Sequence, residues 1–176
     1  EGSPKIPPLY KEKIADPIGA DWGYHSGSQT MHEKARLHIF GWGSAIRTTL
    51  RDFARVGWLW CNWGKWEDRQ VVPEAWLREA TRVAPDILAN SPEETWRYGH
   101  GFWTNEKKGL WPDLPEEGFT AWGAGGHYNV VFPSYGLVVT MNPTPYPGQA
   151  QPYETTTVTW LQQQEVLKMI LEACRR

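Results

Sequence analysis

The stretch Trp122–Met141, WGAGGHYNVVFPSYGLVVTM, decides which fold this chain is expected to have. It contains two apolar runs, Tyr128–Phe132 and Leu137–Met141, which are separated by the four residues PSYG. A short connection with proline and glycine between two runs rich in β-branched residues predicts an antiparallel hairpin. We therefore expect two neighbouring strands here, and a glycine-rich segment leads into the first of them.

Short strands are expected before this hairpin, and a helix after it. The runs Tyr98–Thr104 and Phe119–Trp122 have the aromatic, partly glycine-containing composition of short strands. The chain closes with a predicted helix over Thr159–Cys174. Much of the buried face of that helix is expected to consist of Leu161, Leu167, Ile170, Leu171 and Cys174.

The N-terminal half contains the clearest helical pattern of the chain. Thr49 offers a hydroxyl N-cap and Asp52 a carboxylate three residues later, a variant of the capping box that predicts a helix over residues 48–63. Gly57 is expected to permit close packing, and Gly64 to supply a left-handed residue at the helix end. The apolar face of this helix is expected to consist of Leu50, Phe53, Ala54, Gly57, Trp60 and Cys61.

The other N-terminal segments have weaker patterns. Residues 9–18 resemble the end of a helix that enters a turn at a proline, and residues 19–40 show no period and are expected to form an extended loop. A second helix is predicted from Pro73 to about Thr81, because proline suits a first helical turn. The polar stretch Ala84–Thr95 contains two prolines and is expected to be a connector. Helices, then antiparallel strands, then a C-terminal helix over the sheet predict an α+β fold.

Composition limits the classes of partner and site. The chain has 176 residues, a net charge of −2 and a pI near 6.2, so it lacks the basic excess of a nucleic-acid-binding protein. The chain contains no run of 18 apolar residues, so the sequence predicts no membrane-spanning helix. The histidines lack metal-ligand spacing, so we expect no metal and no cofactor. Cys61 and Cys174 fit no disulfide framework and are expected to be ordinary thiols.

Tryptophan is unusually frequent, with twelve in the chain and a cluster at Trp58, Trp60, Trp63 and Trp66. Two interpretations fit this frequency. The tryptophans form an aromatic surface that binds sugars, apolar acyl groups or a partner chain, or they build the core and a domain contact. The helical spacing of the cluster favours the second interpretation for most of them.

Four stretches, in this order, resemble segments of the class C β-lactamase-like serine hydrolases of the penicillin-recognising superfamily. They are LYKEKIADPIG at Leu9–Gly19, GWGSAIRTTLRDFARVG at Gly41–Gly57, YGHGFW at Tyr98–Trp103, and WGAGGHYNVVFP at Trp122–Pro133. Within the superfamily, the stretches are most similar to carboxylesterases and amide hydrolases, including 6-aminohexanoate-dimer hydrolases. The resemblance implies an acyl-enzyme mechanism with a serine and lysine in Ser-x-x-Lys, a tyrosine in Tyr-x-Asn, and a third motif on a strand.

The chain itself lacks the nucleophile and base that this resemblance implies. It contains no Ser-x-x-Lys and no Tyr-x-Asn; Ser44-Ala45-Ile46-Arg47 has the spacing, but arginine stays protonated at neutral pH and cannot act as a base. In the family both motifs precede the first matching segment. We therefore expect this chain to be the C-terminal half of a hydrolase, with residues 1–95 in the helical region and residues 96–176 as the C-terminal strands and closing helix.

The resemblance also implies which residues of this chain approach a substrate. Trp122 takes the place of the third-motif lysine, and a backbone N–H between Gly123 and Gly125, across Ala124, is the expected oxyanion donor. Gly126 and His127 follow as expected substrate contacts. Tyr24, in the loop after the first matching segment, is an expected pocket-wall residue.

Two hypotheses of different classes remain open from the sequence. The first is part of a serine hydrolase that cleaves a small ester or amide, with its N-terminal half as partner. The second is a non-catalytic, tryptophan-rich binding module or a degenerate hydrolase.

The start, Glu1–Pro8, is polar and has no initiator Met, so we expect the chain to begin partway through a longer protein. The sequence does not indicate where the protein is located in the cell. If the chain occurs alone, exposed sheet edges predict association into homo-oligomers.

Overall fold

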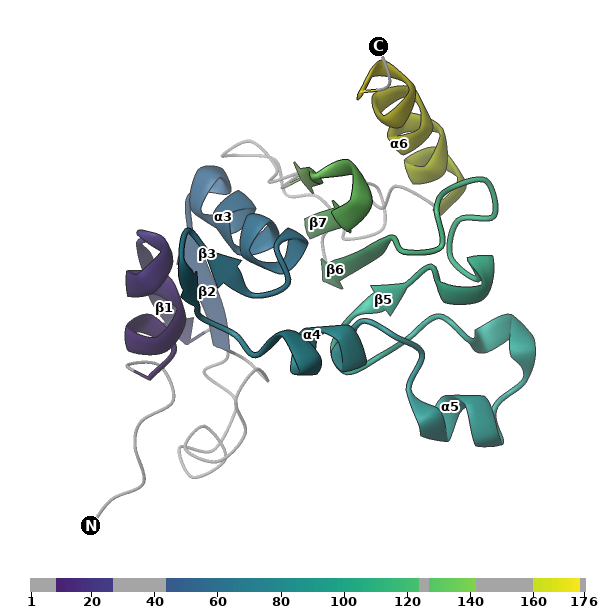
Figure 1. The fold of residues 1–176 in the computed structure, drawn as a ribbon, viewed down its shortest axis with the longest axis horizontal. Helices are drawn as coiled ribbons and strands as arrows, with labels where there is room; N and C mark the ends of the chain where they lie inside the picture. The colour runs from purple at the N-terminus through teal and green to yellow at the C-terminus, as the bar shows by residue number, and fades with distance from the viewer. Residues whose placement is uncertain (1–8, 27–43, 124–126, 142–159, 175–176) are drawn as a thin grey trace.

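A computed structural model describes residues 9–26, 44–123, 127–141 and 160–174. Its largest sheet is antiparallel and has the order β5-β6-β7-β8, with β5 at Trp103–Thr104, β6 at Phe119–Gly123, β7 at His127–Phe132 and β8 at Leu137–Met141 (Figure 1). The predicted hairpin is confirmed: β7 and β8 are joined by a 3-10 turn at Pro133–Tyr135. Gly136 follows with φ of 55°, a left-handed conformation that suits glycine.

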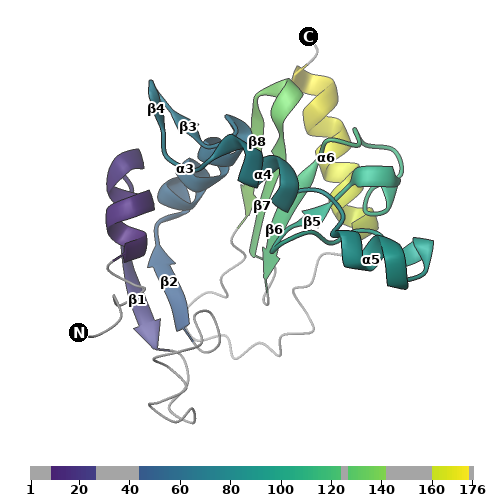
Figure 2. The same cartoon turned by 60° about the horizontal axis from the view of Figure 1, so that its bottom comes forward.

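The two faces of this sheet pack against different helices (Figure 2). Alternate side chains of β7 point to opposite faces, because a strand has a period of two residues. Tyr128, Val130 and Phe132 lie in one core cluster with Leu167 and Leu171 of α6, the helix Trp160–Cys174. The C-terminal helix therefore covers one face of the sheet, and the predicted α+β fold is confirmed.

Helix α3, Leu50–Cys61, packs on the other face of the sheet. Thr49 is its N-cap, and the Thr49 hydroxyl accepts a hydrogen bond from the backbone N–H of Asp52 at 3.1 Å, as the capping pattern predicts. Gly57 lies against β7 and β8, where an added Cβ would come within 2.3 Å of Asn129 Oδ1. Glycine at this position therefore sets how closely the helix approaches the sheet.

The C-terminal end of α3 differs in one detail from the expectation. The N–H of Gly64 donates to Leu59 O at 2.8 Å and the N–H of Trp63 to Trp60 O at 3.0 Å, which is the Schellman pattern. Trp63, with φ of 52°, is the residue directly after the cap, and Gly64 follows it with φ of 81°. The left-handed region thus begins one residue before the glycine.

The pattern of buried residues along α3 also differs from the predicted apolar face. Leu50 is 48% exposed, whereas Leu59 is fully buried. Leu59 joins a second cluster with Ala15, Ile18 and Trp22 of the N-terminal segment. Helix α3 therefore lies between the sheet on one side and the N-terminal segment on the other, which a single apolar stripe does not predict.

The N-terminal segment confirms one expectation and corrects another. Residues 9–18 are helical, with η1 at Lys11–Ala15 and the short 3-10 helix η2 at Asp16–Ile18 around Pro17. The expected loop over residues 19–40 is wrong at Trp22–Ser26, which is strand β1 and pairs antiparallel with β2, Ser44–Thr48. The register is Trp22 to Thr48, a pairing between segments far apart in sequence that a local pattern does not reveal.

The middle of the chain holds short elements. A small hairpin of β3, Lys65–Trp66, and β4, Arg69–Gln70, precedes the predicted second helix, α4, at Glu74–Ala80. The connector over 84–95 contains an unpredicted helix, α5, at Pro85–Asn90, and the 3-10 helix η3 at Glu93–Thr95. The expected strand over 98–104 is mostly a tight turn: Tyr98 bridges to Trp103, and Gly101 has φ of 88°. Another 3-10 helix, η4, follows at Glu106–Lys108.

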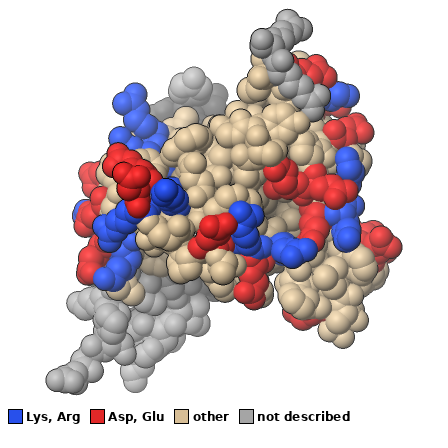
Figure 3. Space-filling model, in the orientation of Figure 1, with Lys and Arg blue, Asp and Glu red and all other residues tan. Residues whose placement is uncertain are grey.

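The surface in Figure 3 has lysines and arginines interspersed with acidic residues. A broad area without charged side chains extends across the middle of this face toward α6. Among the described helices, none is long and apolar enough to span a membrane.

Candidate functional site

A cavity of about 770 Å³ lies between α3, the N-terminal segment and the turn that precedes β5. Its wall is mainly apolar and aromatic. The lining residues are Leu9, Tyr10, Lys13, Ile14, Trp22, Thr48, Thr49, Leu50, Phe53, Val56, Leu59, Trp60, Val72, Trp76, Leu77, His100, Phe102 and His127. Its volume falls in the range of ligand pockets, which are concave and mostly apolar with a few polar groups.

All four stretches that carried the sequence resemblance contribute to this wall. Residues 9–14 come from the first stretch, residues 48–56 from the second, His100 and Phe102 from the third, and His127 from the fourth. These stretches are separated by many residues in sequence, and only the tertiary fold brings them together. The cavity is therefore the candidate site.

The start of α3 is tied to the first stretch by a buried carboxylate. Asp52 Oδ2 accepts from the Thr49 hydroxyl at 2.8 Å, and Asp52 Oδ1 accepts from Arg55 Nη1 at 2.7 Å. The same Arg55 nitrogen donates to the backbone carbonyl of Gly19. The Thr49 hydroxyl, with the Arg55 guanidinium, holds the pKa of Asp52 below its usual value. Asp52 thus takes part in the predicted helix cap, it also links α3 to the first stretch through Arg55, and it does not line the cavity.

Aromatic pairs build much of the cavity wall. The rings of Trp60 and Phe102 meet edge to face, with centroids 5.0 Å apart and an interplanar angle of 87°. The rings of Trp76 and His100 are stacked at 5.9 Å with an angle of 27°. Both geometries are favourable for aromatic pairs. The four side chains therefore form a preorganised apolar surface with one imidazole at its exposed side.

His127, which the resemblance implies as a substrate contact, reaches the cavity. It is the first residue of β7, it pairs with Gly123 at the end of β6, and its side chain is exposed and lines the cavity. Ala124, Gly125 and Gly126, which lie between these two residues, are outside the described residues. The expected oxyanion donor between Gly123 and Gly125 therefore stays a prediction.

Trp122 lies on the opposite face of the sheet. Its ring stacks on Tyr128 with centroids 5.7 Å apart and planes 9° apart, and it lies 5.5 Å from the ring of Trp103. These rings pack against the core cluster that includes α6, whereas the cavity is bounded by α3. The structure thus places the half-buried Trp122 side chain against the core cluster on the α6 face, away from the cavity that His127 lines.

Tyr24, an expected pocket-wall residue, and Ser44, part of a Ser-x-x-Arg motif, both lie in strands. Tyr24 lies in β1 and pairs with Ile46. Its strand neighbour Trp22 lines the cavity, so the strand borders the site. Ser44 lies in β2 and does not begin a helix, whereas the serine of Ser-x-x-Lys in this kind of hydrolase is expected at the start of one. Within the described ranges, no group of three or more His, Cys, Asp or Glu side chains has the arrangement of a metal site.

Several wall residues were not predicted as site residues. Leu50, Phe53 and Trp60 belong to the helix face that the sequence predicts to be apolar, and His100 lies in the run Tyr98–Thr104, which the sequence predicts to be a short strand. Their exposure to the cavity depends on how far α3 lies from the N-terminal segment, which the sequence pattern does not encode. The feature of the sequence that points to this site is the presence of the four stretches in one chain, in the order found in the family they resemble.

The described wall offers two imidazoles, from His100 and His127, and the ammonium group of Lys13. An imidazole can donate a hydrogen bond through one ring nitrogen and accept one through the other. The aromatic surface suits an apolar group of a ligand. The cavity can therefore hold a ligand that has an apolar part and a polar group that forms hydrogen bonds. The described wall contributes no serine or cysteine.

Comparison with solved structures finds a protein described as "putative beta-lactamase from Bacteroides dorei DSM 17855". The TM-score is 0.55 and the identity 19%, and the match covers 92% of this chain and 50% of that one. No family model and no curated protein sequence matches the chain. The chain thus has a β-lactamase-like fold, and it spans about half the length of this structural neighbour.

Proposed function

We propose that this chain is the C-terminal portion of a serine hydrolase that cleaves an ester or amide bond through an acyl-enzyme. The serine, lysine and tyrosine of the reaction come from an N-terminal portion of the same protein. The observation that carries the proposal is the convergence of the four resembling stretches on one cavity. The β-lactamase-like fold is consistent with it.

In this proposal the chain supplies the wall that binds substrate and not the nucleophile. The aromatic surface of Trp60 and Phe102 receives the apolar part of the substrate. The segment from Gly123 to His127 provides the backbone N–H that stabilises negative charge on the substrate oxygen in the transition state. His127, on the cavity wall, contacts the substrate or carries a proton.

The proposed reaction proceeds in two steps, and neither step needs a cofactor. The serine oxygen forms a bond with the carbonyl carbon, its proton passes to the base, and the alcohol or amine leaves with a proton. Water then attacks the acyl-enzyme and releases the acid. An apolar wall favours substrates with an apolar acyl or leaving group, and it gives no preference for a β-lactam.

The test uses the protein with its N-terminal portion. It is incubated with a fluorophosphonate probe, and the labelled residue is mapped by mass spectrometry. The expected result is one labelled serine that precedes Glu1 in the sequence and is followed three residues later by lysine. Absence of labelling, together with no hydrolysis of p-nitrophenyl esters, would contradict the proposal.

A matched pair of variants tests the assigned wall. Trp60 lines the cavity, whereas Trp58 is two residues away on the same helix, is 45% exposed and does not line it. Trp60→Phe is expected to raise KM for p-nitrophenyl esters of long acyl chains, and Trp58→Phe to leave KM unchanged. Equal effects of both variants would remove the cavity from the proposed substrate site.

A non-catalytic binding module is the second candidate, and one observation favours it. Trp76 is 50% exposed beside the cavity and stacks on His100, an arrangement that suits a ligand with a flat apolar face. Ligand binding without fluorophosphonate labelling would favour this candidate over the hydrolase.

A further inference from the structure

The charged group on the wall of the larger cavity, the one of about 770 Å³, is positive. The described residues that line this cavity include a lysine, Lys13, but no aspartate or glutamate. His100 and His127 add ring nitrogens that donate or accept hydrogen bonds. The described wall therefore matches a ligand that carries an anionic group, and it offers no counter-charge to a cationic one.

The carboxylates closest to this wall leave the Lys13 ammonium able to bind an anion. Asp52 accepts from the Thr49 hydroxyl and from Arg55, and it does not line the cavity. Glu12 Oε1 lies 2.6 Å from Lys13 Nζ, but both side chains are exposed, and Glu12 does not line the cavity either. An ion pair between exposed side chains is weak, and an ammonium group has three hydrogens to donate. Lys13 can therefore pair with a ligand anion beside Glu12 or in place of it.

Lys13 and His127 reach the cavity from opposite sides of α3. Lys13 belongs to η1 and His127 is the first residue of β7, and Figures 1 and 2 show α3 between these two elements. The part of α3 that lines the cavity runs from Leu50 to Trp60, which is about 15 Å at 1.5 Å per residue. Its side chains there are apolar, and Phe53 lies among them. A ligand that touches both Lys13 and His127 therefore has two polar ends and an elongated apolar middle.

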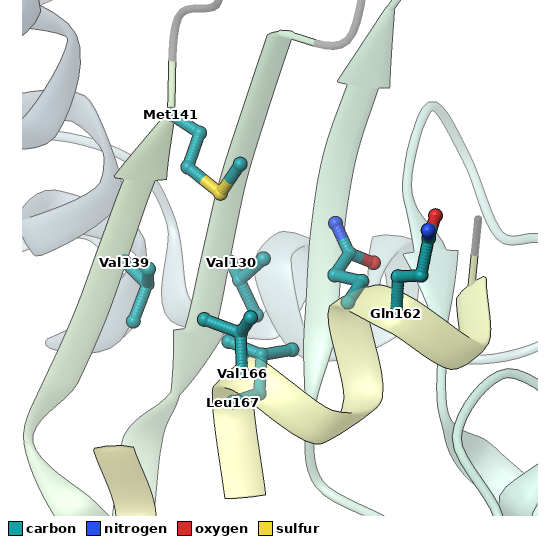
Figure 4. Close-up of a pocket in the computed structure, with 7 residues that line it drawn as sticks. Val130, Val139, Met141, Gln162, Val166 and Leu167 are labelled. Atoms are coloured by element: carbon teal, nitrogen blue, oxygen red, sulfur yellow. The ribbon is translucent and has the colours of Figure 1, made fainter. Parts of the chain in front are cut away.

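A second cavity, of about 250 Å³, lies between α6 and the sheet and has a different wall (Figure 4). Val139 and Met141 of β8 and Val166 of α6 are among its apolar residues. Its polar side chains are two glutamines, whose amides are neutral, and no charged side chain lines it among the described residues. An anion that binds in this smaller cavity would not depend on Lys13.

We infer that the larger cavity takes an ester or amide whose apolar acyl chain ends in a carboxylate. The reacting carbonyl lies at the His127 end, the chain lies along Phe53 and Trp60, and the terminal carboxylate pairs with the Lys13 ammonium. Lys13 is thus a residue that determines specificity, and it takes no part in the bond-breaking steps. The inference rests on the proposed function, because it names the substrate class of that reaction.

The test uses the protein with its N-terminal portion and two esters of equal chain length. The mono-p-nitrophenyl ester of suberic acid has a terminal carboxylate, and p-nitrophenyl octanoate has none. The ratio of their kcat/KM values is expected to favour the suberate ester in the wild type. Lys13→Gln is expected to lower this ratio about tenfold, the size of one hydrogen bond between charged groups. Lys11→Gln is the control, because Lys11 lies in the same helix, pairs with Asp16 and does not line the cavity.

No preference in the wild type, or the same ratio in Lys13→Gln as in the wild type, would overturn the inference. Charge reversal provides a second readout. Lys13→Glu is expected to favour the p-nitrophenyl ester of ω-aminooctanoate over the suberate ester, because it replaces an ammonium with a carboxylate at the same place. A variant that still prefers the suberate ester would also overturn the inference.

Binding without reaction separates this inference from the proposed function. Calorimetry with octanoate, octanol and octylammonium measures binding in the same preparation, and fluorophosphonate labelling reports the nucleophile. Tighter binding of octanoate that Lys13→Gln removes, without a labelled serine or ester hydrolysis, keeps the anion site and removes the hydrolase. A labelled serine and ester hydrolysis without any effect of Lys13→Gln on the preference keeps the hydrolase and removes the anion site.

Discussion

The side-chain amide of Asn129 in β7 donates a hydrogen bond to the backbone carbonyl of Phe53 in α3 at 2.8 Å. Asn129 is fully buried, and its Oδ1 accepts from the hydroxyl of Thr140 in β8 at 3.0 Å. One polar side chain therefore joins the helix to two strands. This link fixes the position of α3, and with it the position of the cavity wall that Phe53 and Trp60 form.

Gly57→Ala is expected to destabilise the protein by about 1–3 kcal/mol, the usual cost of overpacking. The new Cβ would lie 2.3 Å from Asn129 Oδ1 in β7 and 2.6 Å from Val138 Cγ1 in β8, so either α3 or these two packed side chains must shift. Urea unfolding measures the change. Gly23→Ala is the control, because no atom lies within 4 Å of its added Cβ. Equal stability of the two variants would contradict the close contact.

Local signals predicted the elements that local interactions determine. The Thr49 cap, the periodic helix after it and the proline- and glycine-containing turn before Leu137 depend on residues within a few positions of each other. Helix α3, the hairpin and α6 were accordingly predicted with nearly correct bounds. The α+β fold followed from their order.

Elements that depend on distant pairing were not predicted. Strand β1 pairs with β2 across an intervening segment, and its sequence WGYHS has no alternation to identify it. Trp122 and His127 lie close in sequence, but strand alternation sends their side chains to opposite faces of the sheet. The order of the four stretches pointed to the site, whereas its wall depends on tertiary packing that the pattern does not contain.

Cys61 is expected to resist thiol reagents while Cys174 reacts. Burial raises the pKa of the Cys61 thiol to about 11, so at pH 8 only about one thiol in a thousand is ionised, and the thiolate is the reactive form. Cys174 is exposed. Ellman's reagent should modify one thiol rapidly in the folded protein and a second after denaturation. In Cys174→Ser the rapid phase should disappear, and its persistence would show that Cys61 is accessible.

Asp52→Asn is expected to lower stability at neutral pH and to lose this effect in acid. The Thr49 hydroxyl and the Arg55 guanidinium depress the folded-state pKa of Asp52 below its value of about 3.9 in the unfolded chain. The carboxylate therefore stabilises the fold fully above about pH 4, and this contribution is lost as pH falls through the lower folded-state pKa. Urea unfolding between pH 7 and pH 2.5 should show the wild-type and variant curves converging. The exposed residue Asp68, changed to Asn, is the control, and a constant difference across this range would contradict the assignment.

Asn105→Ala is expected to cost about 3 kcal/mol of unfolding free energy, because one buried amide organises the loop between β5 and β6. Asn105 is fully buried, its Oδ1 accepts from the N–H of Trp111 at 2.6 Å, and its Nδ2 donates to Trp111 O at 3.0 Å and Pro115 O at 2.9 Å. Alanine leaves these buried backbone groups without partners and a cavity beside Trp111. Since Trp111 also donates to Gln163, the loss should reach α6 and appear as faster hydrogen exchange in residues 160–167. Asn90→Ala, which removes a single exposed bond to Asp86 O, should change stability by less than about 0.5 kcal/mol. A similar small change for Asn105→Ala would show that the loop holds its conformation without this side chain.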